Sequence, residues 1–181
     1  TFAVPDAKIP YYRARDPAVL RLDPFFETFF IRFNVSRPPL DNPLVRQALA
    51  RAIDRVRLCR DVLHAGEQPA HFLTPPGTAG YTYAGPGIPD DPAGARRLLA
   101  EAGYPGGKGF PVLDLKMNTD DKNRKIFEAI QEMWRRELGI TVTLSNEDFR
   151  AYLNDMTAVN FDLLRSRWIG VHTDEVYFRD T

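Results

Sequence analysis

The segment from residue 112 to residue 166 alternates between the period of a strand and the period of a helix. Residues 112–118 and 140–144 alternate apolar and polar side chains, as half-buried strands do. Residues 119–138 between them carry an apolar stripe at helical spacing, made of Ile126, Ile130, Met133, Trp134 and Leu138. A short helix around Phe149 and a third apolar strand at 161–166 follow. This order predicts an α/β fold with a mixed, mostly parallel sheet flanked by helices.

Capping residues, prolines and glycines predict where the helices begin and end. Asn42-Pro43 and Asp91-Pro92 each join a capping side chain to a proline suited to the first helical position, so a helix is expected at each. We expect Asp54 to cap a second short helix, and Ser145 or Asn146 to cap the helix before the last strand. Each of three predicted helices ends at a glycine, namely Gly66, Gly103 and Gly139.

The first part of the chain is less regular in its pattern. Residues 1–18 contain three prolines and are predicted to be an irregular linker, followed by one α/β lobe over residues 19–181. Residues 19–22 are expected to form a short strand, and the aromatic run at 25–33 a largely buried one. Residues 68–90, rich in proline and glycine, predict an ordered loop that packs over the rim of a cleft or lies on the surface without a role.

Composition narrows the range of partners. The chain has 181 residues, of which 44% are hydrophobic, so it can bury one substantial core. Lys and Arg together number 24, as do Asp and Glu, and this balance lacks the basic surface of a protein that binds nucleic acid or anionic membranes. No apolar run approaches the roughly 20 residues of a membrane span. We therefore expect no nucleic-acid partner and only an indirect connection to a membrane.

Residues that carry metal, redox or nucleophilic chemistry are scattered. Cys59 is the only cysteine, which excludes an internal disulfide and a paired-cysteine metal site, and its place on an apolar helical face favours a core role. The three histidines form no cluster at metal-ligand spacing. His172 and Asp174 could form half of an acid-base pair, but no nucleophile accompanies them. We expect no metal, no cofactor and no catalytic residue.

Polar and aromatic side chains follow the last predicted strand. The run at 161–165 is typical of a buried strand, and Arg165, Trp168, His172 and Asp174 then supply donors, acceptors and a large ring. Ligands of open α/β sheets bind outside the carboxyl ends of strands, and Trp168 lies just past such an end. The residues predict a loop that contacts a ligand, although a tryptophan that only caps the strand would explain the same pattern.

Several motifs, in a fixed order, resemble those of one protein family. The longest is NVSRPPLDNPLVRQALARAIDR, from Asn34 to Arg55. It is followed by TPPG at 74–77, DPAGARRLLAEAGY at 91–104, LGI at 138–140 and WIG at 168–170. Together they resemble the extracellular solute-binding proteins, family 5, of oligopeptide and dipeptide ABC transporters. The resemblance covers about residues 25–178.

The resemblance implies a two-lobed, non-enzymatic receptor with a periplasmic-binding-protein fold of the class II-like type. Such a receptor is periplasmic or extracytoplasmic, in some cases lipid-anchored, and delivers a peptide or other small solute to an ABC permease. Residues 19–181 would then be an incomplete C-terminal lobe, with residues 1–18 on the hinge side. Because two lobes clamp the ligand, one lobe alone is expected to bind weakly or not at all.

The resemblance also implies a set of ligand-contacting residues. Phe149 matches an aromatic of the cleft wall, Arg165 a basic strand residue near bound peptide, and Trp168 the loop that lines the cleft. The full predicted set is Phe149, Arg165, Trp168, Ile169, Gly170, Val171, His172 and Asp174. One position departs from the family, because Val171 stands where an aspartate usually pairs with the amino group of the peptide. Either Asp174 replaces that aspartate, or the ligand has no free amino terminus.

Two other functions remain as hypotheses. The same fold occurs fused to DNA-binding domains, so a ligand-sensing module of a transcriptional regulator is the alternative. A signal peptide and first lobe ahead of Thr1 would support transport, whereas a helix-turn-helix would support regulation. An enzyme that uses His172 and Asp174 is the third hypothesis, and it predicts that changing either residue abolishes turnover of a substrate.

Overall fold

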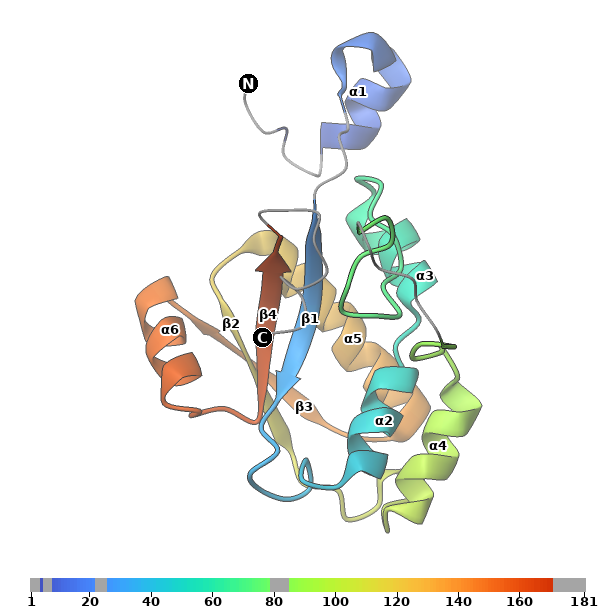
Figure 1. The fold of residues 1–181 in the computed structure, drawn as a ribbon, viewed down its shortest axis with the longest axis vertical. Helices are drawn as coiled ribbons and strands as arrows, with labels where there is room; N and C mark the ends of the chain where they lie inside the picture. The colour runs from blue at the N-terminus through green and yellow to red at the C-terminus, as the bar shows by residue number, and fades with distance from the viewer. Residues whose placement is uncertain (1–3, 5–7, 22–25, 79–84, 171–181) are drawn as a thin grey trace.

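Four strands form one sheet in the order β1-β4-β2-β3 (Figure 1). The computed structural model describes residues 4, 8–21, 26–78 and 85–170. β4 (Leu163–Ile169) lies between β1 (Glu27–Phe33), to which it is antiparallel, and β2 (Leu113–Asn118), to which it is parallel. β3 (Val142–Glu147) is parallel to β2. Helices flank this sheet, so the predicted α/β class with a mixed, mostly parallel sheet is confirmed.

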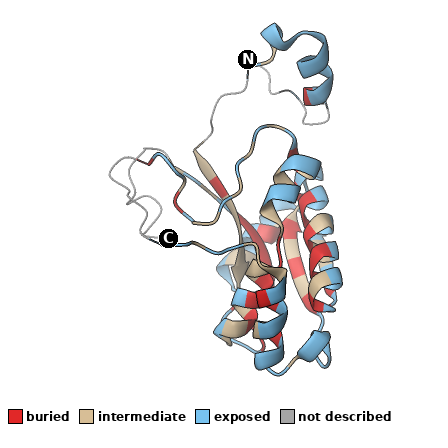
Figure 2. Ribbon diagram, turned by 90° about the vertical axis from the view of Figure 1, so that its right-hand side faces the viewer, coloured by how far each residue is buried: buried red, intermediate tan, exposed pale blue. Residues whose placement is uncertain are grey.

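The helices cover the two faces of the sheet unequally. The main core lies on one face, under α2 (Pro43–Arg51), α3 (Arg55–Leu58), α4 (Pro92–Glu101) and α5 (Asp121–Leu138) (Figure 2). α6 (Phe149–Thr157) packs on the other face, where Tyr152, Phe161 and Leu164 form a small cluster. The residues of β2 that alternate with its core side chains, Asp114, Lys116 and Asn118, also lie on this face.

β4 is buried on both of its faces at its amino end. Leu163 belongs to the main core and Leu164 to the small cluster under α6, and both are 0% exposed. Because successive side chains of a strand point to opposite faces, Arg165 shares the face of Leu163. Trp168 shares the face of Leu164 for the same reason.

Acidic and amide side chains begin the helices. Asn42 and Asp91 accept backbone N–H groups at the first turns of α2 and α4, as predicted. Asp148 caps α6, so the prediction of Ser145 or Asn146 is wrong. The reason is that β3 continues through both of those positions.

Two of the three predicted helix ends are confirmed. Gly103 and Gly139 follow α4 and α5 with φ of 98° and 69°, which a residue without Cβ adopts at little cost. The prediction for Gly66 is wrong, because α3 continues into a π-helical turn at Cys59–Leu63 that closes at His64. The His64 N–H donates to the carbonyl of Cys59 at 3.2 Å, two residues before the glycine.

The N-terminal region is more regular than predicted. α1 (Ile9–Arg15) lies inside the segment expected to be irregular; the proline in its first turn is tolerated, because the N–H it lacks would have no partner within the helix. The strand predicted at 19–22 is wrong over its described residues, since Val19 ends a 3₁₀ turn. β1 is confirmed, but only Thr28 in it is buried, because this edge strand pairs on one side.

The loop after α3 is tied to the sheet. The Thr28 hydroxyl donates to the carbonyl of Leu73 at 2.6 Å, and the Ile88 N–H donates to the carbonyl of His71 at 3.1 Å. The described parts of residues 68–90 contain no helix or strand. Among the described ranges, no helix is both long and apolar enough to cross a bilayer.

Candidate functional site

The carboxyl ends of the parallel strands lie together at one end of the sheet, which we call its carboxyl edge. β2, β3 and β4 run in the same direction, so their last residues lie at this edge. β1 starts there, because Glu27 pairs with Ile169. α6 begins at Phe149, directly after β3. The structure therefore brings Trp168 and Phe149 to one edge, on the face under α6.

Trp168 belongs to β4 and not to a loop after it. β1 pairs with β4 continuously from Phe33 opposite Leu163 to Glu27 opposite Ile169. The Gly170 N–H then donates to the carbonyl of Phe26 at 2.9 Å. The expectation that the strand ends near Arg165 is wrong, because pairing with β1 holds the polar residues extended.

Arg165 is buried within the sheet on the face of the main core. Its residue is 8% exposed, and its guanidinium carbon lies 5.3 Å from the centre of the Phe29 ring. Its Nε is enclosed and has no hydrogen-bond partner among the described residues. The Tyr152 hydroxyl donates to its carbonyl at 2.6 Å from the other face. Phe29 and the main core thus separate this side chain from the face of Trp168.

Trp168 presents a buried donor at the carboxyl edge. Its indole Nε1 is enclosed without a hydrogen-bond partner in the described part of the chain. In contrast, the indole of Trp134 donates to the carbonyl of Leu49 at 2.8 Å, as buried tryptophans usually do. An enclosed donor without an acceptor costs free energy, which a bound acceptor group would recover. This difference favours a ligand-contacting role for Trp168 over a capping role.

Residues of β1 share the face and edge of Trp168. Thr28 lies directly opposite Trp168, and Phe30 lies opposite Ser166, so these side chains point to the same face. Arg32 follows two residues further along β1 on that face. The alternation in the predicted strand at 25–33 could have grouped Thr28, Phe30 and Arg32. It could not have shown that Trp168 is their neighbour, because this depends on the register with β4.

Phe149 is the most exposed aromatic of the predicted set. It is 60% exposed and stacks on Tyr152 with ring centres 6.0 Å apart. Ile169 is 39% exposed and Gly170 is half-buried, both at the end of β4. The other predicted ligand residues, Val171, His172 and Asp174, lie outside the described residues.

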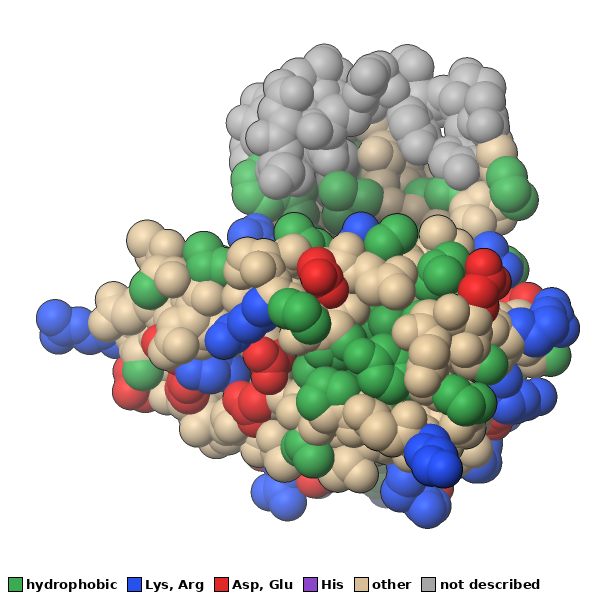
Figure 3. Space-filling view, turned by 90° about the horizontal axis from the view of Figure 1, so that it is seen from below, with side chains coloured by type: hydrophobic (Ala, Val, Ile, Leu, Met, Phe, Trp, Pro, Cys, Tyr) green, Lys and Arg blue, Asp and Glu red, His purple; other side chains and the backbone are tan. Residues whose placement is uncertain are grey.

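One lysine pairs with two carboxylates under α6. Lys116 on β2 lies 3.3 Å from a carboxylate oxygen of Glu147 and also bonds to Asp155 of α6. The hydrogen bond from Lys116 lowers the pKa of Asp155. The other carboxylate oxygen of Glu147 is buried and has no partner among the described residues. The molecule seen from below likewise mixes both signs of charge (Figure 3).

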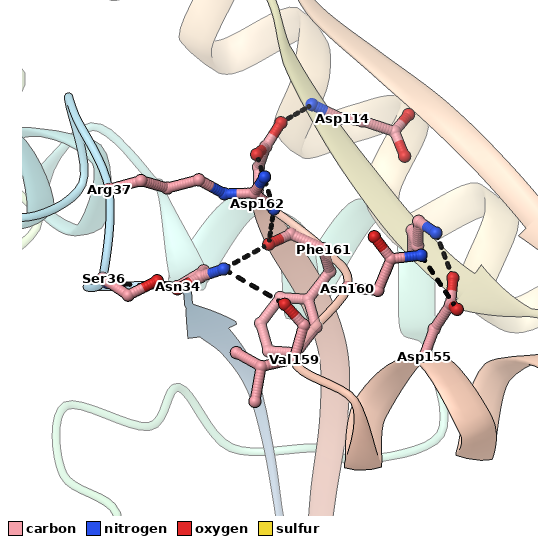
Figure 4. Close-up of polar contacts among 10 residues, drawn as sticks. Asn34, Ser36, Arg37, Asp114, Asp155, Val159, Asn160, Phe161 and Asp162 are labelled. Carbon is pink, nitrogen blue, oxygen red and sulfur yellow. Dashed lines mark hydrogen bonds and ion pairs between the residues drawn. The ribbon is translucent and has the colours of Figure 1, made fainter.

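The start of β4 is held by the first residues of the longest motif. The amide of Asn34 is 4% exposed and donates to the carbonyl of Phe161 at 2.9 Å (Figure 4). Arg37 donates to the same carbonyl at 2.7 Å and lies 3.4 Å from Asp162. Asn34-Val35-Ser36 matches the Asn-x-Ser glycosylation sequon, but it is no glycan site, because its asparagine is buried and hydrogen-bonded. This part of the motif positions the strand that carries Trp168.

Neither Cys59 nor any group of residue types that bind metals forms a reactive centre in the described structure. Cys59 packs against the main core, and burial raises the pKa of its thiol, which disfavours the reactive thiolate. Within the described ranges, no group of His, Cys, Asp and Glu could hold a metal ion. What the described site offers is aromatic surface and hydrogen-bond donors.

The fold and this edge together define an α/β binding lobe. Residues 2–181 match the bacterial extracellular solute-binding proteins, family 5, middle part. The chain therefore belongs to this family of solute-binding proteins, and the predicted resemblance is confirmed.

Relatives of known name agree with this assignment. The chain is 33% identical over 168 residues to the periplasmic murein peptide-binding protein MppA of Escherichia coli, covering 90% of this chain and 31% of MppA. It is 31% identical over 184 residues to the probable deoxycholate-binding periplasmic protein YgiS of the same organism, covering 98% of this chain and 34% of YgiS. The crystal structure of a periplasmic oligopeptide-binding protein from Borrelia burgdorferi superposes with a TM-score of 0.85 at 36% identity, covering 97% of this chain and 34% of that one. The chain spans about a third of the length of these relatives.

Proposed function

We propose that this chain forms part of the substrate-binding component of an ABC transporter for oligopeptides or similar solutes. The family assignment and the similarity to peptide-binding relatives support this function. The similarity to a probable deoxycholate-binding protein widens the solute class beyond peptides. The relatives are periplasmic by name, which supports a periplasmic or extracytoplasmic location, with a lipid anchor as one form of attachment.

The ligand is held in a cleft between two lobes, of which residues 19–181 supply most of one. The support for this arrangement is that the chain matches about a third of each relative while forming a single sheet with its own core. Closure of the two lobes would bring the second face of the cleft to the edge where β2, β3 and β4 end. Delivery to an ABC permease then involves the whole protein.

The observation that carries the proposal is the indole N–H of Trp168 at the carboxyl edge, which has no hydrogen-bond partner among the described residues. Phe149 on the same face and edge would contribute ring surface, and the backbone of Ile169 and Gly170 would contribute donors and acceptors. Val171 lacks the charge that would bind a peptide ammonium, so the preferred solute is one without a free amino terminus unless Asp174 supplies that charge.

Native mass spectrometry of the whole protein, purified from its host, tests the proposal by looking for a co-purified solute. Calorimetry with that solute then compares Trp168→Phe and Trp168→Ala with the unchanged protein. Trp168→Phe keeps a ring and removes the N–H, so affinity should fall about twofold to tenfold, and Trp168→Ala should lower it further. Tyr104→Phe, on the far side of the main core, is the control and should bind normally. A whole protein that takes up no peptide or related solute would refute the transport function.

A further inference from the structure

The face that carries Trp168 also carries a cation that no carboxylate of the described residues neutralises. Arg32 on β1 makes no ion pair with any described residue. Its Nε donates to the Ser166 hydroxyl at 3.0 Å, and its guanidinium carbon lies 5.8 Å from the centre of the Phe30 ring. These two contacts fix the plane of the guanidinium and leave its two terminal nitrogens for another acceptor.

The register places this cation close to Trp168. The Arg32 guanidinium lies beside Phe30 and Ser166, which pair with each other. The next pair on this face is Thr28 with Trp168, so the guanidinium is two residues along the strand from the tryptophan. Two residues along a strand correspond to about 7 Å. A single small solute can therefore contact the indole of Trp168 and the guanidinium of Arg32 at the same time.

Two other basic side chains described on this side of the sheet are already paired. Lys116 is held by Glu147 and Asp155 beneath α6, and Arg37 is held by Asp162 at the start of β4. Arg165 lies on the opposite face of β4, against Phe29. α6 stands on one side of β4 and β1 on the other (Figure 1). Of these four described basic side chains, Arg32 is thus the one available on the face of Trp168.

We infer that Phe30, Arg32, Ser166 and Trp168 form a subsite for an anionic group, most simply a carboxylate, of the transported solute. Arg32 donates to the carboxylate with its terminal nitrogens, Ser166 orients Arg32, and the rings of Phe30 and Trp168 contact the apolar part of the solute next to the charge. The inference rests on the proposed function and adds a preference to it: the protein selects acidic solutes, such as peptides with a Glu or Asp side chain at one position.

Calorimetry on the whole protein tests the inference with paired tripeptides, each used with a free and with an acetylated amino terminus. The two members of each pair differ only by Glu or Gln at one position, and each of the three positions is examined in turn. Unchanged protein should bind the Glu member at one position at least about tenfold more tightly than the Gln member. Arg32→Gln should remove this difference, and Arg32→Glu should shift the preference to the same tripeptide with Lys at that position. Arg124→Gln, an exposed change on α5, should leave the preference intact.

The outcomes separate the two proposals. Equal affinity for Glu and Gln members at every position, or an Arg32→Gln protein that keeps the preference, would overturn the acidic subsite and leave the transport function standing. Absence of binding by every tripeptide and by the co-purified material would overturn both. Circular dichroism and thermal unfolding of each variant show whether it is folded, and Arg32→Glu gives a gain of binding that misfolding cannot produce.

Discussion

The hydroxyl of Tyr152 joins α6 to the strand that carries Trp168, and removing it gives the sharpest test of how that strand is supported. Tyr152 is 3% exposed, and its hydroxyl lies 2.6 Å from the carbonyl oxygen of Arg165. Tyr152→Phe keeps the ring, so the cluster with Phe161 and Leu164 stays filled and no cavity forms. The change isolates one buried hydrogen bond.

The expected loss follows from that geometry. A neutral hydrogen bond contributes about 0.5–1.5 kcal/mol net, and a buried acceptor left without its donor costs about 1–3 kcal/mol. We therefore expect Tyr152→Phe to lower the free energy of unfolding by about 1.5–2 kcal/mol. For a chain of 181 residues, this lowers the Tm by about 3–8 °C.

Urea unfolding followed by tryptophan fluorescence measures this loss, with Tyr104→Phe as the matched control. Tyr104 is half-buried against Phe110, with ring centres 5.0 Å apart, and its hydroxyl makes no hydrogen bond with a described residue. Its removal should change the free energy of unfolding by less than about 0.5 kcal/mol. Equal effects of the two substitutions would refute the idea that the Tyr152 hydroxyl ties α6 to β4.

Three further predictions concern a turn, an ion pair and the isolated lobe. Gly107→Ala should lower the free energy of unfolding by about 2–3 kcal/mol, because φ is 79° and a Cβ would lie 2.5 Å from the carbonyl oxygen of Gly139. Gly103→Ala, at φ of 98° with nothing within 4 Å, should cost only about 1 kcal/mol in the same urea titration, and the idea fails if the two cost the same. Lys116 lowers the pKa of Asp155, so the contribution of this ion pair to stability is fully present above the unfolded pKa of about 3.9 and is lost as pH falls through the folded value. Asp155→Asn should therefore destabilise the protein more at about pH 6 than at about pH 2.5, and a loss that is the same at both values would contradict this. Calorimetry of the 181-residue chain alone should show no micromolar binding to a peptide library, because one lobe supplies one wall of the cleft.

Local patterns in the sequence predicted the elements whose cause is local. The alternation at 112–118 gave β2, and the apolar stripe of residues 119–138 gave α5, because each has one buried face. Asn42 and Asp91 predicted two helix starts because a cap depends on neighbouring residues only. Family resemblance, rather than any pattern, identified Phe149 as a candidate, and the structure adds that it lies on the face and edge of Trp168.

Features that depend on distant parts of the chain were missed. β3 extends past Ser145 because it pairs with β2 up to Glu147, and β4 extends to Ile169 because β1 lies beside it. Neither extension continues the apolar pattern of its strand, because residues 145–147 are polar and Ser166 and Arg167 separate Trp168 from the apolar start of β4. Arg32 escaped notice for the same reason, since its importance comes from pairing across more than a hundred residues of sequence with β4.

The length of β4 also decides which arginine a solute can reach together with Trp168. Residues three apart on a strand point to opposite faces, so an extended segment through Ile169 places Arg165 on the side away from Trp168. A loop after residue 165 would have allowed both side chains to turn toward one solute. Phe29 lies beside the Arg165 guanidinium within the main core, whereas Arg32 reaches the Trp168 face directly. If a solute contacts Trp168 through its apolar part, the cation that sets its preferred charge is therefore Arg32, and Arg165 acts on the site through its backbone bond to Tyr152.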